Sequence, residues 1–162
     1  MSYRAIWLML LLLPATLLAQ GPKNPLPTAL VPPQIGTARK VFLANGGCDV
    51  STLQFFKRDG DLNKPYNQVY AAMEAWDGYE LVSSPSDADL VFQISSAQHD
   101  SHDFASLQLV IRDAKTNIQL WTVIETFIGG SRKTTFEKDF AQTVAALMND
   151  VKQLKAGAEP NS

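Results

Sequence analysis

Two histidines and two aspartates lie within five positions of one polar segment, residues 95–108: His99, Asp100, His102 and Asp103. These are the only histidines in the chain. Histidines three residues apart can share a metal ion where the backbone is helical or tightly looped, and a neighbouring carboxylate can assist. A catalytic zinc normally takes three protein ligands, however, and no distant cysteine or histidine cluster is present to complete the set. A polar loop between two strands is therefore the simpler interpretation, and a metal or proton-transfer site is the alternative.

A second candidate site follows the last predicted strand, in the segment IGGSRKTT (residues 128–135). Two consecutive glycines free its backbone, and Ser131, Arg132 and Lys133 precede a predicted helix, whose N-terminus favours anions. The segment lacks the four-residue gap and the Gly-Lys-Ser/Thr order of a phosphate-binding loop. A flexible connection between strand and helix is the simpler interpretation, and an anion or partner contact at these three residues is the alternative.

The only cysteine, Cys48, has no second cysteine with which to form an internal disulfide. A nucleophilic thiol needs a nearby base and a lowered pKa, and the sequence places neither histidine beside it. We expect a small buried residue, because free cysteines are among the most buried residue types. A free thiol and an intermolecular disulfide are the alternatives. The chain also contains no serine nucleophile elbow and no dinucleotide-binding fingerprint, so we expect no catalytic residues and no cofactor.

The N-terminus, residues 1–19, has the features of a secretory signal peptide. A short basic region with Arg4 precedes an apolar run at 6–13, and Ala19 supplies the small residue of a cleavage point. The run is shorter than the ~20 residues that span a membrane, so we expect no span in the mature protein. Removing Arg4 leaves 13 of the 14 basic residues against 16 acidic ones, with no long basic run, which disfavours nucleic acid as a partner. We therefore expect an exported protein, and the absence of an N-x-Ser/Thr glycan acceptor fits bacterial export to the periplasm or the exterior.

Proline content and hydrophobic periodicity divide the rest of the chain. Residues 20–38 include five of the nine prolines and predict an extended tether. Residues 39–155 predict one α+β domain, and residues 156–162 predict a disordered tail. Within the domain, period-two patterns predict strands at 39–45, 79–84, 88–95, 106–113 and 118–127.

Two helices are expected from apolar residues at helical spacing. The first contains Tyr66 and Tyr70 within residues 65–78, and the second carries an apolar stripe from Phe136 onward. Thr134 and Glu137 have the spacing of a capping box at the start of the second helix. The order β-α-β-β-β-β-α predicts an α+β fold in which one mixed sheet carries two helices packed on one face.

A resemblance to a known family rests on the segment ADLV (residues 88–91) and on Asp113, Thr116, Leu120 and Trp121 in the following hairpin. With these motifs the chain resembles secreted bacterial proteins of unknown function. More distantly, it resembles the envelope family that includes the TolB N-terminal domain, the curli-assembly protein CsgG and the lipoprotein activator LpoB.

This resemblance extends over residues 39–155 and implies a periplasmic or envelope interaction domain rather than a catalyst. The lipid-anchor cysteine of CsgG and LpoB and the propeller of TolB are expected to be missing, so a lipoprotein or translocation role is not carried over. We therefore expect a non-catalytic domain that docks on another envelope protein through an exposed sheet edge or the loop at 96–105. Two alternatives stay open: a small metal- or anion-dependent hydrolase that uses the loop with His99 and His102, and a subunit of a homo-oligomeric envelope assembly.

Overall fold

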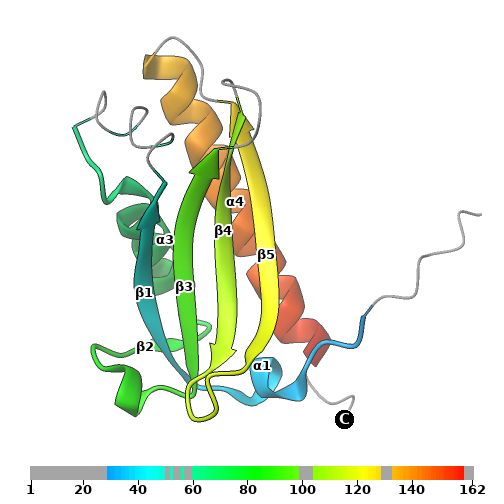
Figure 1. Cartoon of the computed structure of the whole chain (residues 1–162). Coiled ribbons are helices and arrows are strands. Elements are labelled where there is room, and N and C mark those ends of the chain that lie inside the picture. Colours follow the sequence, from blue (N-terminus) through cyan, green and yellow to red (C-terminus); the bar gives the residue numbers. More distant parts are fainter. Residues whose placement is uncertain are drawn as a thin grey trace, which may run out of the picture.

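The computed structural model describes residues 29–49, 52, 56, 60–98, 104–128 and 133–158, whose arrangement Figure 1 shows. In chain order the elements are α1 (Pro33–Thr37), β1 (Lys40–Cys48), α3 (Lys64–Trp76), β2 (Glu80–Leu81), the 3-10 turn η1 (Pro85–Asp87), β3 (Leu90–Gln98), β4 (Phe104–Asp113), β5 (Gln119–Ile128) and α4 (Lys133–Ala158). The strands form one sheet in the order β2-β1-β3-β4-β5. β1 runs parallel to β2 and β3, whereas β3, β4 and β5 are antiparallel neighbours. The predicted α+β fold with one mixed sheet is confirmed.

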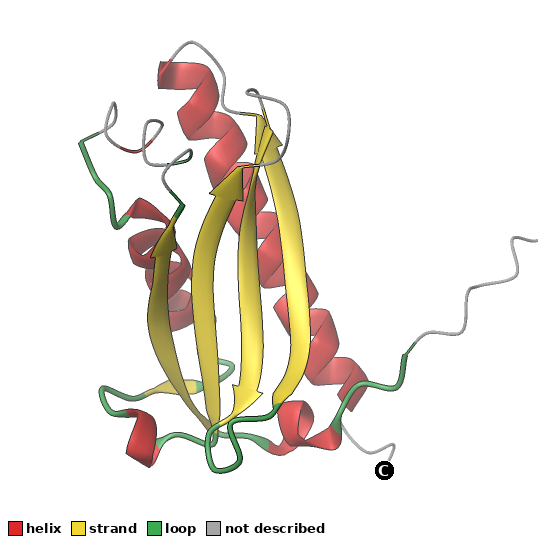
Figure 2. Cartoon of the chain, in the orientation of Figure 1, coloured by secondary structure: helices red, strands yellow, loops and turns green. Residues whose placement is uncertain are grey.

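Helices α3 and α4 lie against the same face of the sheet (Figure 2). The strands supply the alternation that this arrangement requires. In β4, Leu107, Leu109 and Ile111 are fully buried beneath the helices, whereas Gln108 and Val110 point to the other side and are half-buried. No described element covers that other side in Figure 2. We call it the open face.

An aromatic cluster fills the core between β5 and α4. Its four rings have centroids 5.2 to 6.4 Å apart, mostly in the tilted or edge-to-face geometry that aromatic pairs prefer. The cluster consists of Phe56, Phe127, Phe136 and Phe140, all of them buried. The predicted apolar stripe of the last helix therefore does face the core.

Helix α1 lies inside the segment 20–38 that we expected to be extended. Proline is favoured in the first turn of a helix, where its missing N–H is not needed, and Pro33 occupies that turn. Ile35 is fully buried, and the Tyr79 hydroxyl donates a hydrogen bond of 2.9 Å to its carbonyl. The Lys155 ammonium lies 4.0 Å from the centre of the Tyr79 ring. These contacts join the start of the described chain to the end of α4.

Two further boundaries differ from the sequence predictions. The strand predicted at 79–84 pairs only over Glu80–Leu81, because Ser84 accepts a hydrogen bond from the Ser86 N–H and turns the chain into η1. The last helix continues through Ala158, which is buried, although we expected disorder from residue 156.

Candidate functional site

The segments predicted to hold a metal or an anion fall mostly outside the described residues. This applies to His99, Asp100, His102, Asp103, Ser131 and Arg132, whereas Lys133 is the exposed first residue of α4. Within the described part of the chain, no group of three or more histidines, cysteines, aspartates or glutamates is placed to hold a metal ion. Both sites therefore stay predictions.

Among the described residues, the surroundings of the Cys48 thiol work against its activation. The side chain is half-buried, and its Sγ lies 3.9 Å from the Leu62 carbonyl, to which it donates. Burial raises the pKa of the Cys48 thiol, and the negative charge of Asp49 raises it further. A raised pKa keeps the thiol protonated at neutral pH, which is the opposite of what nucleophilic catalysis requires.

The aspartates of the family-like motifs hold the backbone. The Asp89 carboxylate accepts the N–H groups of Lys40 at 3.0 Å and Arg39 at 2.9 Å, and these bonds lower its pKa. Asp113 accepts the backbone N–H and the hydroxyl of Thr116 at 2.8 and 3.0 Å, which likewise lowers its pKa. Asp89 therefore ties β3 to the start of β1, and Asp113 closes the turn between β4 and β5.

The outer edge of β1 is paired only at its start. The Arg39 carbonyl accepts the Glu80 N–H at 2.7 Å, and the Val41 carbonyl accepts the Val82 N–H at 3.0 Å. Because alternate residues of a parallel strand turn their backbone groups to opposite sides, the next outward residue is Leu43. Its N–H and C=O point away from β3, beyond the end of β2, and no strand in the described ranges pairs with them.

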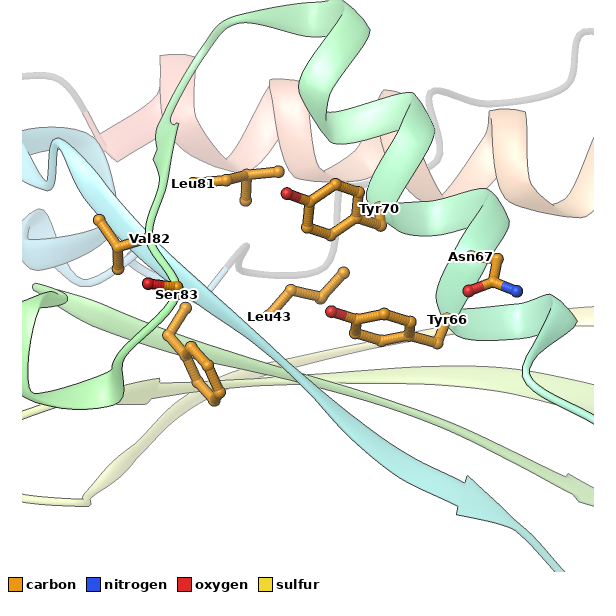
Figure 3. A pocket seen from close by; sticks show the side chains of 8 residues that line it. Leu43, Tyr66, Asn67, Tyr70, Leu81, Val82 and Ser83 are labelled. Atoms are coloured by element: carbon orange, nitrogen blue, oxygen red, sulfur yellow. The ribbon is translucent and has the colours of Figure 1, made fainter.

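A cavity of about 560 Å³ opens beside this edge, between β1, α3 and the segment after β2 (Figure 3). Tyr66 and Tyr70 of α3 point toward the segment 81–83, and their ring centroids are 5.9 Å apart. Leu43, only 3% exposed, lies between that segment and the tyrosines. The lining consists of Phe42, Leu43, Tyr66, Asn67, Tyr70, Leu81, Val82 and Ser83.

The described lining of the cavity has the character of a recognition surface. It combines aliphatic and aromatic walls with the hydroxyls of Tyr66, Tyr70 and Ser83. Tyrosine offers an apolar ring and a polar tip, which is why it is common where proteins bind other proteins. This arrangement can accept an apolar side chain next to backbone groups with which no described strand pairs.

Tyr66 and Tyr70 were expected only as members of the apolar side of this helix. Val69 and Met73 of the same helix do face the core and are at most 1% exposed, whereas Tyr70 is 37% exposed. The spacing of Tyr66 and Tyr70 places them on one side of the helix, and that spacing was the available signal. The opposite wall comes from residues 81–83, which sequence spacing does not connect to them.

At the other edge of the sheet, Glu125 of β5 and Asp150 of α4 form a pair of neighbouring carboxyl groups. Burial raises the pKa of Glu125, and the hydrogen bond and negative charge of Asp150 raise it further. The folded state therefore binds this proton more tightly than the unfolded state does. The resulting stability is fully present at low pH and is lost as the pH rises through the raised pKa.

Replacement of Glu125 by glutamine is therefore expected to stabilise the protein at pH 7.5 and to have a smaller effect at pH 4. Thermal unfolding at the two pH values measures the difference. Glu74→Gln, at an exposed position of α3, is the control and is expected to shift the melting temperature little at either pH. Equal shifts for Glu125→Gln at both pH values would contradict the assignment.

No protein-family model matches this chain, and no curated protein matches it. Among solved structures, a methionine-substituted PelC dodecamer from Paraburkholderia phytofirmans is similar at 10% identity with a TM-score of 0.47, covering 70% of this chain and 87% of that one. The LpoB C-terminal domain from Salmonella enterica is 14% identical with a TM-score of 0.38, and the match covers 54% of this chain and 81% of that one. Lipoprotein GNA1162 from Neisseria meningitidis is 12% identical with a TM-score of 0.41, and the match covers 70% of this chain and 96% of that one.

These similarities include LpoB, a member of the envelope family that the sequence resembles, but they assign no activity to this chain. Among the described residues, no helix combines the length and apolar character needed to cross a membrane.

Proposed function

We propose that this protein is an exported, non-catalytic interaction domain that binds an extended segment of another envelope protein at the outer edge of β1. The observation that carries the proposal is the cavity lined by Tyr66 and Tyr70 beside the outward backbone of Leu43. An added strand would satisfy that backbone, and one of its apolar side chains would enter the cavity. Main-chain pairing gives affinity in this mode, and side-chain pockets give specificity.

The short β2 supports this proposal. It pairs with β1 only through Lys40↔Glu80 and Val41↔Leu81, so from Leu43 onward no described strand pairs with the outer side of β1. A register shift between Asn45 and Gly47 then interrupts the strand. The available edge is thus short, and the side chain in the cavity must supply much of the binding energy.

Affinity capture with the mature protein (residues 20–162) tests the proposal, using envelope extracts of its own source and mild cross-linking. We expect one stoichiometric partner whose recovery falls about tenfold or more when Tyr66 and Tyr70 are both replaced by alanine, because aromatic anchors dominate such interfaces. Ile118→Ala is the control, since this side chain is 62% exposed in the β4–β5 turn, away from the cavity lining. An empty capture, or equal recovery by the double variant, would refute the proposal.

A further inference from the structure

Strand β5 forms the edge of the sheet opposite to β2, and none of the other described strands pairs with its outer side (Figure 1). The hydrogen bonds fix which of its residues face outward. The Ala114 N–H bonds to the Asp89 carbonyl at 3.0 Å, so the even-numbered residues of β4 turn their backbone groups toward β3. The odd-numbered residues of β4 then face β5, where Leu109 pairs with Val123. On β5 itself, the even-numbered residues are therefore the outward ones.

These outward residues are Thr122, Ile124 and Thr126, and their side chains lie on the open face. One contact agrees with this direction: the Thr126 carbonyl accepts a hydrogen bond of 3.4 Å from the Thr143 hydroxyl of α4, outside the β4–β5 ladder. Ile124 is 54% exposed. The middle of the strand therefore offers backbone groups with which no described strand pairs, beside an exposed aliphatic side chain.

The edge of β5 lacks the features that usually prevent strand pairing. Proteins protect edge strands with lysine, proline, bulges or inward charges. From Trp121 to Ile128 there is no lysine, arginine or proline, and the register with β4 is regular after a shift near Arg112. The one charged residue, Glu125, lies on the side of the helices beside Asp150, away from the outward residues.

The residue types of the outward positions come in the same order from either end of the strand. Thr122, Ile124 and Thr126 form the pattern Thr–Ile–Thr, which is symmetric about its centre. An antiparallel second copy centred on Ile124 would place Ile124 against the same residue of the other copy and Thr122 against Thr126. Cross-strand threonine pairs and aliphatic pairs are both stabilising. A self-complementary patch is what a twofold dimer requires.

We propose that β5 is a homodimer interface, in which two copies pair their β5 strands antiparallel with Ile124 on the twofold axis. The three outward residues of each copy would form about four backbone hydrogen bonds across this interface, and about two more where the Thr126 carbonyl, which already accepts the Thr143 hydroxyl, takes a second donor on its other lone pair. The two five-stranded sheets would then join into one, with the β1 edges at its two outer ends. The proposal is therefore independent of the function proposed for the β1 edge.

A second cavity, beside the proposed β5–β5 interface, fits this arrangement. A cavity of about 430 Å³ lies along the edge of β5, between the strand and α4, and its lining includes Trp121, Ile124 and Leu154. An added β5 strand would lie beside the mouth of this cavity and shield apolar surface that is now open. Burial of such surface adds to the hydrogen bonds of the interface.

The mass of the mature protein in solution, measured by light scattering over a range of concentrations, tests the proposal. We expect twice the monomer mass, and we expect Ile124→Lys to weaken the dimer by about 100-fold or more, because it places two ammonium groups at the axis. Gln108→Lys is the matched control: it adds the same charge on the open face, one strand inward, and is expected to stay dimeric. A monomer at every concentration, or an unchanged mass for Ile124→Lys, would overturn the proposal.

Disulfide trapping tests the register without relying on a disruptive variant. In a Cys48→Ser background, Ile124→Cys is expected to form a covalent dimer on oxidation, because directly opposed Cα atoms in such a pair are about 5.5 Å apart. Thr122→Cys is expected to stay monomeric on a denaturing gel, since the Cα atoms of the two Thr122 residues would be about 14 Å apart across the axis. Cross-linking at Thr122 but not at Ile124 would overturn the proposed register.

Discussion

Phe140→Ala is expected to lower the free energy of unfolding by about 3–5 kcal/mol, the usual cost of removing a large aromatic side chain from a packed core. The ring is fully buried. Its centroid lies 5.2 Å from that of Phe127, 5.6 Å from Phe56 and 5.7 Å from Phe136. Loss of the ring therefore leaves a cavity at the centre of the cluster that joins α4 to β5. Urea unfolding followed by circular dichroism measures the loss.

The matched control for this prediction is Phe104→Ala, which removes the same side chain from the start of β4. Phe104 is 46% exposed, so its loss opens no enclosed cavity, and we expect a cost below about 1.5 kcal/mol. Similar losses for Phe104→Ala and Phe140→Ala would show that the aromatic cluster is not the centre of the core.

The strands and long helices of the fold could be predicted from the sequence because their buried side chains are apolar and recur at the spacing of a strand or a helix. The alternation of Leu107, Leu109 and Ile111 identifies β4, and the stripe that begins at Phe136 identifies α4. Helix α1 escaped prediction because proline density suggests an extended chain. The helix is held by the burial of Ile35 and by its hydrogen bond from Tyr79, which is distant in the sequence. Local sequence spacing does not show these contacts.

The candidate binding edge could be predicted only in general terms. An exposed sheet edge was expected, but which strand would provide it depends on the early end of β2, and η1 and its serine cap determine that end. The cavity forms because Tyr66 and Tyr70 face residues 81–83 across it. The two walls come from separate elements, and sequence spacing does not show that they lie together. The motif aspartates Asp89 and Asp113 were visible in the sequence, but their role in holding the backbone follows from the hydrogen bonds alone.

The expected capping box at the start of α4 is replaced by a different interaction. Helix α4 begins at Lys133, so Thr134 lies within its first turn. The Glu137 carboxylate accepts a hydrogen bond of 2.5 Å from the Lys64 ammonium at the start of α3. The Lys64 side chain is only 6% exposed, and its ammonium also lies 5.4 Å from the centre of the Phe136 ring. The two helices are thus joined by a buried cation whose counterion is half-buried.

Glu137→Gln is expected to lower the free energy of unfolding by about 2–3 kcal/mol, because it removes the carboxylate charge that faces the buried Lys64 ammonium. This value is below the 3–5 kcal/mol typical of a broken buried pair, since aromatic rings still contact the cation. Lys64→Met is expected to cost less, because methionine fills the space of the lysine stem and Glu137, 38% exposed, keeps water as a partner.

The double variant Lys64→Met, Glu137→Gln decides whether the two side chains act as a pair. Once the cation is gone, removal of the Glu137 charge has little left to disrupt, so the double variant is expected to be close to Lys64→Met alone. The coupling energy from chemical denaturation should then exceed about 1 kcal/mol. The exposed Lys40–Glu80 pair, with charged atoms 3.9 Å apart, is the control and should show coupling below about 0.5 kcal/mol. Additive losses at Lys64 and Glu137 would mean that packing of the lysine stem, rather than the ion pair, joins α3 to α4.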